Sequence, residues 1–597
     1  MMLKTSSNKK SPALGMFLFT IRQNIGIIVL TVICMLLICP GFLMIHLDET
    51  LEGLNGYSYE FNTVLMIFSV CGSIAGAAGV VVYNIINFMY LYSKKSSDVF
   101  HAIPLTRTQL LLSRGLAGLA STLIPLVVGY IALICLTAVY PKLIVDLEIL
   151  AVGFFYNILI MLIAWSISLI FIICAGTVFD FVLSFGIINV ALLLLPLIVS
   201  TIADEMLFGF SNRELSILLK WFSPIYFAVY SMEDFINRAV SFKIAEDSVQ
   251  RYSIFNSNEW IMLGVSLVII IGLTVLTAWL YNRRKAEKAA NAYAFKFIYV
   301  ITNILLSFEV AYGVGLIFSE FEYNFVFWIF SVAGALLAAV VFGAISERGF
   351  KTVKKSILLG GGSIAGLIAI FVILATGGFG YESRIPQIDD IATIEVDISG
   401  RYVDLSSDFE LVRNLHKNII DDYDEAIEKS WEKDGDVYCT SIQIEYTLKN
   451  GAKMRREYWS LPVDDFGEDI VKICKKEDIQ SHITQLNLDK PKHIGFDGNF
   501  YDGIEETEDY FSCNIPKEEA IKLLEIYKKE NLLMTPEMLS GNRVVNYYLN
   551  WDTGYYSSHN YYEFYIGDNY TEFIEAVENI KKKYESPYKE ESEKYID

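Results

Sequence analysis

Nine apolar stretches, each long enough to cross a bilayer, occupy about the first 380 of the 597 residues. A membrane-spanning helix needs about 20 apolar residues to cover a hydrocarbon core about 30 Å thick. The predicted spans are Ile25–Ile45, Phe61–Leu91, Leu116–Val139, Ile149–Cys174, Val182–Ile202, Trp260–Tyr281, Phe297–Phe318, Phe325–Ile345 and Leu358–Phe379. The sequence therefore predicts a polytopic α-helical membrane protein with about nine spans.

The last 217 residues differ from the rest of the chain in charge. Tyr381–Asp597 contains 47 acidic and 25 basic residues, whereas the preceding part contains 21 acidic and 23 basic ones. This acidic tail is predicted to be a soluble domain. It does not favour nucleic acid as a partner, because phosphate binding requires clustered Lys and Arg. Its many aromatic residues favour a folded domain over a disordered one.

The distribution of Lys and Arg predicts the orientation in the membrane, because basic loops resist translocation. Basic residues gather in the amino-terminal segment and in the loops after the second, sixth and eighth spans. They are Lys4, Lys9, Lys10, Arg22, Lys94, Lys95, Arg107, Arg114, Arg283, Arg284, Lys285, Lys288, Arg348, Lys351, Lys354 and Lys355. Of the intervening loops, His46–Glu60 has none and Tyr140–Glu148 has one. We therefore predict a plasma-membrane protein with a cytoplasmic amino terminus and an extracellular tail.

Four regions follow from these patterns. Residues 1–24 form a cytoplasmic segment in which Pro12–Arg22 is interpreted as an amphipathic helix in the inner interface, or alternatively as a disordered leader. Residues 25–281 form a six-span core, and residues 282–380 add three spans. Residues 381–597 form the acidic extracellular α+β domain.

The tail shows alternating strands and amphipathic helices. Its predicted strands are Thr393–Ile398, Val437–Leu448, Met454–Trp459, Val544–Trp551 and Tyr561–Ile566, and its predicted helices are Phe409–Trp431, Pro516–Glu530 and Thr571–Tyr584. The order of strands, helix and hairpin recurs weakly, which indicates two subdomains. Tyrosines crowd the second hairpin, either as a binding face or as ordinary strand residues.

Two connections are longer than simple links. Lys94–Arg114 is predicted to contain a short amphipathic helix capped by Ser96 or Ser97 and ended by Pro104, with Thr106 capping the next helix. Such a helix suits a groove on a partner protein, although a solvated elbow is the alternative. In Asp204–Glu259, two apolar islands are predicted to be helices that either enter the outer leaflet or pack on other spans.

Motifs for catalysis by the chain itself are missing. The sequence contains no G-x-x-x-x-G-K-[ST] phosphate loop, no HExxH and no G-x-S-x-G. The cysteines and histidines lack metal-site spacing. The sequence allows one disulfide among Cys439, Cys474 and Cys513 but does not decide whether it forms. Glu309 lies inside the seventh span, where an ionisable residue is either part of a polar or proton pathway or a buried hydrogen-bonding group.

Three segments resemble the membrane subunits of ATP-binding-cassette (ABC) exporters, the type-2 permeases of Gram-positive bacteria with a C-terminal extracellular domain. The segments are DVFHAIPLTRTQLLLSRGLAG (Asp98–Gly118), YNRRKAEKAA (Tyr281–Ala290) and MFLFTIRQN (Met16–Asn24). The resemblance covers about residues 12–290. Ala290 stands where relatives often have glycine.

This resemblance implies a transport subunit that is not itself an enzyme and holds no cofactor. A separate ABC ATPase would bind ATP and Mg²⁺, and a second permease, identical or different, would complete the pathway for an amphiphilic or peptide-like cargo. The residues it implies for coupling to the ATPase are Asp98, Phe100, His101, Ile103, Pro104, Leu105 and Arg107, with a basic segment at Arg283, Arg284, Lys285 and Glu287. Replacing Phe100 or Arg107 is expected to uncouple hydrolysis from transport. The alternative function is a membrane sensor whose extracellular domain binds a ligand without transport.

Overall fold

The structure is a computed structural model. It describes residues 11–37, 61–139, 147–211, 223–230, 232, 257–398, 401–405, 408–432, 439–476, 479, 483–484, 486, 493–502, 505–506, 511–536, 539, 545–552, 560–566 and 570–584. The chain forms two compact units. The helical unit comprises Met1–Ser200, Leu215–Val240 and Tyr252–Phe371, and the sheet unit comprises Thr201–Glu214, Ser241–Arg251 and Val372–Asp597.

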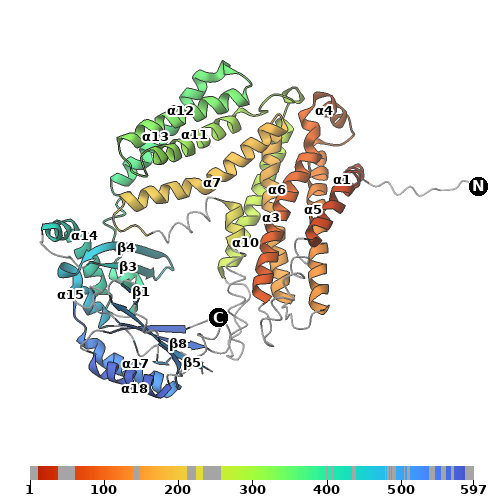
Figure 1. Cartoon of the computed structure of the whole chain (residues 1–597). Coiled ribbons are helices and arrows are strands. Elements are labelled where there is room, and N and C mark those ends of the chain that lie inside the picture. The colour runs from red at the N-terminus through yellow and green to blue at the C-terminus, as the bar shows by residue number, and fades with distance from the viewer. Residues whose placement is uncertain are drawn as a thin grey trace, which may run out of the picture. The chain divides into compact units, whose positions relative to one another are not determined.

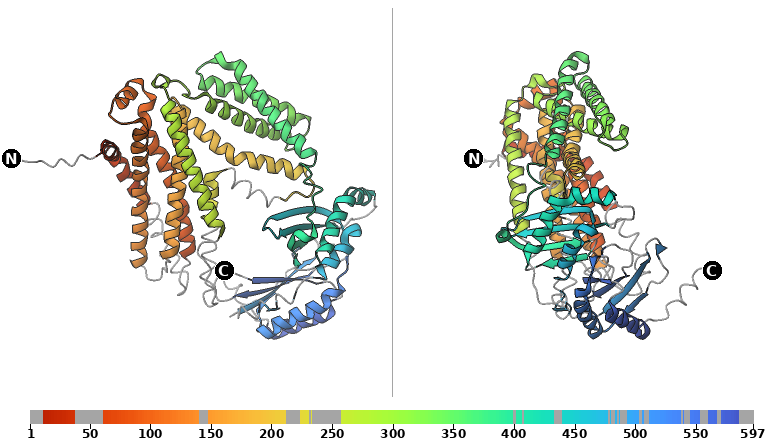
Figure 2. Two further views of the ribbon diagram at one scale, coloured as in Figure 1. Left: turned by 180° about the vertical axis from the view of Figure 1, so that it is seen from behind. Right: turned by 90° about the vertical axis from the view of Figure 1, so that its left-hand side faces the viewer.

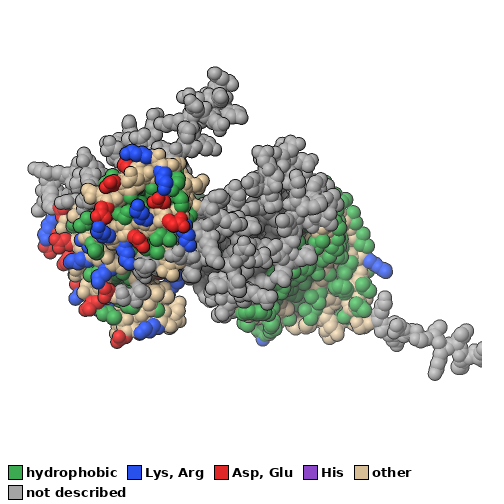
Figure 3. Space-filling view, turned by 90° about the horizontal axis from the view of Figure 1, so that it is seen from below, with side chains coloured by type: hydrophobic (Ala, Val, Ile, Leu, Met, Phe, Trp, Pro, Cys, Tyr) green, Lys and Arg blue, Asp and Glu red, His purple; other side chains and the backbone are tan. Residues whose placement is uncertain are grey.

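Within the described residues, nine helices are long and apolar enough to cross a membrane. They are α1 (Pro12–Leu36), α3 (Phe61–Phe88), α5 (Arg107–Val139), α6 (Leu147–Cys174), α7 (Val178–Met206), α10 (Ser257–Arg283), α11 (Lys296–Phe318), α12 (Phe325–Ser346) and α13 (Val353–Ala375). Each predicted apolar stretch therefore gives a long helix, and these nine candidate spans are compatible with a membrane protein. Figure 3 shows apolar side chains covering helices on one face, and mixed charges over the sheet unit.

Five of these helices, α1, α3, α5, α6 and α10, form a bundle around α6 (Figure 1). In the apolar window of α6, 89% of the residues are buried, against 11% for α1. Small residues allow close approach between the helices, which is a common way of packing helices in membranes. At Gly115 of α5, for example, the Trp165 indole of α6 donates a hydrogen bond of 2.9 Å to the glycine carbonyl.

The amino-terminal helix differs from the prediction at one boundary. α1 runs without a break from Pro12 to Leu36, so the expected separation of an interfacial helix from the first span does not appear. Ser11 caps its start by accepting a hydrogen bond from the Leu14 amide. Asn24, at the expected break, is buried and donates to Asn87 and Ser121, which ties this point of α1 to α3 and α5.

The helices α11, α12 and α13 form a second group, shown in green from two sides in Figure 2. Gly315 and Ser331 bring α11 and α12 together, because a Cβ atom at Gly315 would lie 2.2 Å from the Ser331 hydroxyl. Ser363 of α13 donates to the Ile304 carbonyl of α11 at 2.9 Å.

One apolar island of the long loop is partly described. Residues 224–230 are helical, and Ala228 and Met232 are buried against α6 and α10. This island therefore packs on two of the long apolar helices. The island Leu215–Leu219 lies outside the described residues.

The sheet unit contains two antiparallel sheets, each with helices. The first has strand order β2-β1-β3-β4 and is built from β1 (Ile391–Ile398), β2 (Arg401–Leu405), α14 (Phe409–Glu432), β3 (Cys439–Leu448), β4 (Lys453–Pro462) and α15 (Val463–Cys474). The second has order β6-β5-β8-β9 with β7 on β5, and is built from β5 (His493–Asp502), β6 (Glu505–Glu506), β7 (Phe511–Asn514), α17 (Lys517–Glu530), β8 (Val545–Asp552), β9 (Asn560–Ile566) and α18 (Thr571–Tyr584).

The two sheets share one connectivity, in which a hairpin and a helix are followed by a second hairpin and a second helix. This confirms the predicted repetition. Each sheet buries one face against its helices, because apolar residues alternate along the strands. In the first core Ile394 and Ile444 meet α14 and α15. In the second, Phe496 and Phe564 meet α17 and α18.

Several predicted features of the tail can be located. Tyr547 and Tyr562 are core residues of the second sheet, which favours the structural interpretation for these two tyrosines, whereas Tyr555 and Tyr556 lie outside the described residues. Cys474 and Cys513 are buried in the first and second cores respectively.

Residues 207–211, which follow α7 and belong to the sheet unit, pack within that unit, and we call this segment the α7 junction. Leu207 and Ser211 are buried, and the Phe208 ring lies 4.6 Å from that of Tyr423 and 4.9 Å from that of Tyr458. The Phe208 amide donates to a Glu382 carboxylate oxygen at 2.9 Å. Gly209, at a φ of 71°, has its Cβ position only 2.7 Å from the Tyr458 ring. Only glycine fits there.

Candidate functional site

The predicted coupling loop folds as a short helix between two 3-10 or turn segments. The 3-10 helix η2 (Met89–Tyr92) extends α3, and α4 (Lys94–His101) follows it. The predicted caps at Ser96 and Ser97 are wrong, because both residues lie inside α4, which begins after Ser93. The helix ends before Ala102, ahead of Pro104 as predicted.

The predicted cap of the next helix is confirmed. Thr106 and Gln109 form a reciprocal pair: the Gln109 amide donates to the Thr106 hydroxyl at 3.2 Å, and the Thr106 amide donates to the Gln109 side chain at 3.1 Å. This is the capping box that satisfies free amides at a helix start. It fixes where α4 passes into α5.

The inner side of α4 packs on α5 and η2 through an aromatic–cation stack. The Phe100 ring lies 4.4 Å from the Tyr90 ring, and the Arg114 guanidinium lies 4.6 Å from the Phe100 centroid. Arg114 is buried and donates to the Asn87 carbonyl at 2.6 Å. A cation over aromatic faces is attracted by their quadrupoles, more strongly when water is excluded. Phe100 therefore anchors α4 inside the chain.

A chain of polar contacts joins α4 to the end of α10. The hydroxyls of Tyr90 and Tyr281 lie 2.7 Å apart, and the Tyr281 hydroxyl lies 3.5 Å from His101 Nε2. Burial, and after it the nearby Arg107 guanidinium, lowers the pKa of the His101 imidazole. Its surroundings therefore favour the neutral form of the imidazole.

Arg107 binds the carboxyl end of α10. Its Nη1 donates to the carbonyls of Tyr281, Asn282 and Arg284 at 3.4, 3.1 and 2.8 Å. The last carbonyls of a helix have no partners within it and carry partial negative charge, so a guanidinium is a favourable cap. Arg107 thereby joins the start of α5 to α10.

Arg284 likewise binds backbone carbonyls and joins the end of α6 to η2. Its guanidinium donates to the carbonyls of Ile172 and Ile173 in the last turn of α6 and to that of Ala175, just after it. It also donates to the Leu91 carbonyl in η2. Burial lowers the pKa of this guanidinium, yet arginine keeps its charge in proteins. The four carbonyls compensate the buried charge.

The basic segment continues through η4 (Ala286–Lys288) and back past the α6–α7 turn. The Gly176 amide donates to the Ala292 carbonyl, and the Ala290 amide donates to the Gly176 carbonyl. Ala290 has a φ of 66°, a left-handed conformation that glycine adopts more readily. The noted departure from the family pattern thus falls on a position whose backbone favours glycine.

The remaining residues of the basic segment face outward. Lys285 and Glu287 are exposed, and the exposed Arg283 lies over the Trp279 ring at 4.0 Å. Of the predicted loop residues, Ile103 and Leu105 are half-buried against the bundle core, and Pro104 is exposed.

The opposite side of α4 carries exposed residues at helical spacing. Lys95, Asp98, Val99 and Ala102 form this outer face, on which Val99 is 67% exposed. An exposed valine between charges on a short, internally anchored helix is a suitable protein-docking feature. The sequence predicted the loop, but it did not separate the anchoring residues from the outer face.

Glu309 does not belong to this cluster. It lies within α11, and its Oε1 atom is buried without a hydrogen-bond partner. Within the part of the chain that the structure describes, no three His, Cys, Asp or Glu side chains gather as a metal site.

Sequence reasoning missed Tyr90, Tyr281 and Arg114, which hold the loop in place. A signal was present, since Arg114 stands beside a long apolar stretch and Tyr90 and Tyr281 each end one. Comparison with known proteins adds nothing to these inferences: no family model, no curated protein and no solved structure matches the chain.

Proposed function

We propose that the chain is the membrane-spanning permease subunit of an ABC exporter, coupling ATP hydrolysis by a separate ATPase to movement of an amphiphilic or peptide-like cargo. The observation that carries this proposal is the two-sided character of α4. Its inner side is anchored by Phe100 and His101, and its outer face is bare around Val99. The resemblance of Asp98–Gly118 to the coupling segment of exporter permeases indicates that the partner is an ABC ATPase.

Anchoring allows α4 to transmit movement. A partner shifts a conformational equilibrium only through contacts that differ between two states. Force on the outer face would reach α5 and η2 through the Phe100–Arg114 stack, and α10 through Arg107. We therefore assign Phe100, His101 and Arg107 the positioning of α4, and Lys95, Asp98, Val99 and Ala102 the contact with the ATPase.

The proposed assembly sits in the plasma membrane with α4 in the cytoplasm and the sheet unit outside the cell. ATP and Mg²⁺ would bind the partner ATPase, and a second permease would complete the transport pathway. The basic loops support this orientation, because Lys94, Lys95, Arg283 and Lys285 are exposed on or near α4.

Substitution of Val99 tests the proposal. Val99→Glu should leave the fold intact, since exposed positions tolerate change, but it should abolish co-purification of an ABC ATPase from the same genome that co-purifies with the wild type, and stimulation of its turnover. The matched control is Phe350→Glu, which alters an apolar residue that is 76% exposed in another basic loop.

Two outcomes contradict the proposal. Full stimulation by the Val99→Glu protein would exclude the outer face as the docking site. A wild-type chain that binds no ATPase but responds to an extracellular ligand would favour a membrane sensor instead.

A further inference from the structure

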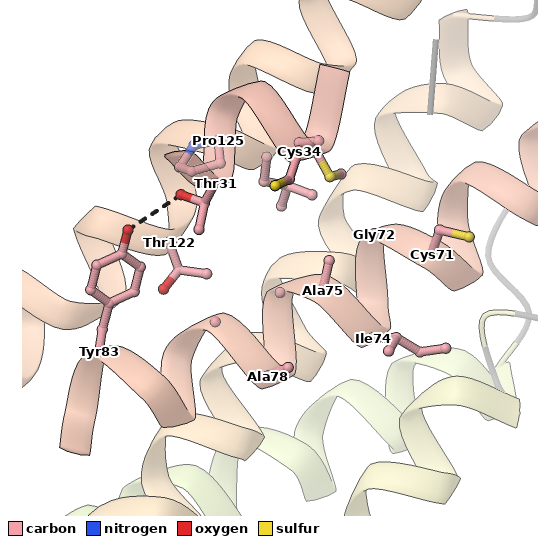
Figure 4. A pocket seen from close by; sticks show the side chains of 14 residues that line it. Thr31, Cys34, Cys71, Gly72, Ile74, Ala75, Ala78, Tyr83, Thr122 and Pro125 are labelled. Carbon is pink, nitrogen blue, oxygen red and sulfur yellow. Dashed lines mark hydrogen bonds between the residues drawn. The ribbon is translucent and has the colours of Figure 1, made fainter. Parts of the chain in front are cut away.

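A pocket of about 320 Å³ lies in the helical unit between α1, α3 and α5 (Figure 4). Protein interiors rarely leave voids much larger than a water molecule. This volume is about twice that of an engineered apolar cavity of about 150 Å³ that binds benzene. The pocket therefore requires an explanation.

The pocket arises from the way three helices meet. At one end the Thr31 and Tyr83 hydroxyls lie 3.3 Å apart and join α1 to α3. Figure 4 shows Cys71 of α3 at the end of the pocket away from Tyr83, with Ala75 and Ala78 between them. The side chains that α3 presents there include Ala75 and Ala78, which are too small to fill the space.

The lining accepts only an apolar guest. No Asp, Glu, Lys, Arg or His belongs to the described residues that line it, and its side-chain oxygens are the hydroxyls of Thr31, Tyr83 and Thr122. The two threonine hydroxyls already donate to carbonyls of their own helices, at Ile27 and Gly118. A polar group without a partner costs free energy when it is buried, so a charged or amide-containing ligand does not fit.

One side of the pocket is open to the helix surface. Ile74 is 65% exposed, and Ala75 and Ala78 are exposed as well. These residues lie within the candidate membrane span Val70–Tyr92. A long flexible molecule can therefore enter from the side while the rest of it stays outside.

We propose that this pocket binds one hydrocarbon chain of an amphiphile, whose polar head remains outside the pocket. The chain belongs either to a bilayer lipid or to a transported amphiphile, since both offer the same chemistry. The proposal does not depend on an ATPase partner, so it can fail or hold independently of the proposed transport function.

A transmembrane helix of another protein is a poorer occupant. A helix about 10 Å wide rises 1.5 Å per residue, so about 320 Å³ holds fewer than about three helical residues. The glycines of α3 are also already used within the chain. A Cβ at Gly76 would lie 2.9 Å from Met161 of α6, and one at Gly79 would lie 2.9 Å from Thr122 of α5.

Photolabelling tests the proposal on the full-length chain in nanodiscs. The probe is a phosphatidylcholine with a diazirine in one acyl chain, and the label is mapped by mass spectrometry. Label should concentrate on α1 and α3 around the pocket. Ala78→Trp should reduce it by about tenfold or more, because the indole occupies space that the acyl chain would need. The control, Val82→Trp, alters an exposed residue of the same helix that does not line the pocket.

Equal labelling of the two variants would overturn the proposal. The native cysteine thiols give a second test, which uses the wild-type chain and needs no substitution. Cys34 and Cys135 are both exposed, but only Cys34 lines the pocket. Adding back long-chain phosphatidylcholine to delipidated protein should slow N-ethylmaleimide modification of Cys34 relative to Cys135. Equal slowing at both would also overturn the proposal.

The two sources of the chain are then separated with the ATPase present. When photolysis is carried out during ATP turnover, a loss of labelling in the pocket identifies the chain as that of a transported amphiphile. Labelling that is unaffected by turnover identifies a resident bilayer lipid. Either result supports the hydrocarbon-chain site.

Discussion

The contacts that hold α4 through Tyr90, Phe100 and Arg114, which we call the α4 junction, resemble the α7 junction of the sheet unit. The two are closed to different extents. In both, aromatic rings and buried arginines hold a short segment. Arg284 donates to four carbonyls around α6 and η2. In the sheet unit Arg456 donates to the carbonyls of Tyr381 and Arg455 and lies 3.8 Å from the Tyr381 ring.

The difference lies in what remains uncovered. In the α7 junction Leu207, Gly209 and Ser211 are all buried, so this contact is complete within the chain. In the α4 junction the outer face remains exposed at Val99. A closed junction completes the packing within its own unit, whereas a half-open junction presents a fixed surface to a partner. This contrast supports α4 as the partner-binding element.

The largest effect expected from a single substitution is at the α7 junction. Gly209→Ala places a methyl group 2.7 Å from the Tyr458 ring at a φ of 71°. Strain and overpacking together should destabilise the sheet unit by about 3 kcal/mol. The measurement is hydrogen exchange of β3 and β4 in the full-length chain.

Gly451→Ala is the matched control for that experiment. Gly451 also has a positive φ, 82°, but no atom lies within 4 Å of its Cβ position. It should therefore show only the conformational strain, about 1 kcal/mol. Equal effects at both glycines would mean that Tyr458 does not close the α7 junction.

The half-open junction should respond differently on its two sides. Phe100→Ala removes the ring between Tyr90 and Arg114 and should destabilise the helical unit by about 2 kcal/mol. Val99→Ala, one residue away but exposed, should change stability by less than about 0.5 kcal/mol. The midpoint of thermal unfolding of the purified chain measures both. Similar losses would contradict the assignment of an inner and an outer side.

The long apolar runs made the membrane-spanning helices predictable, because their length alone restricts them to one structure. Alternation along Thr393–Ile398 likewise predicted β1, and Thr106 predicted a cap from its own side chain. These features depend on residues close together in the sequence. The repeated sheet was predicted only weakly, because β5 carries two glycines and no clear alternation.

The organisation of the candidate site could not be predicted in the same way. Tyr90 and Tyr281 are 191 residues apart, and Arg284 binds carbonyls more than 100 residues away. Backbone carbonyls carry no sequence signal, so a buried arginine that caps another helix looks like any loop arginine. The packing shows that Phe100 anchors α4 inside the chain. The resemblance implied only that the loop takes part in coupling.

Acid should destabilise the core of the first sheet, where Tyr458 also contacts the α7 junction. His416 contacts Tyr446 and Tyr458, and burial, with a smaller effect of Arg456, lowers the pKa of its imidazole from 6.5 to about 3. Between these values the unfolded chain binds a proton that the folded chain does not. Stability should therefore fall as pH decreases from about 6.5 toward 3, by at most about 1.4 kcal/mol per pH unit.

The measurement is the pH dependence of hydrogen exchange in β3. His416→Gln keeps a side chain that can bond the Tyr446 hydroxyl but removes the titrating group, so its profile between pH 6 and 4 should be flatter than that of the wild type. The same slope in both proteins would show that other groups cause the loss of stability.

The smallest effect concerns the loop that follows the α4 junction. Ala290 has a φ of 66°, whereas its neighbour Ala289 is buried at a φ of −59°. Ala290→Gly should relieve left-handed strain and stabilise the chain by about 0.5 kcal/mol, while Ala289→Gly should destabilise it. The midpoints of thermal unfolding of the two variants show whether each substitution stabilises or destabilises the chain. If Ala290→Gly also lowers the midpoint, the entropy lost by glycine exceeds the strain. In that case the alanine here stabilises the segment that carries Arg284, rather than being a tolerated departure from the family pattern.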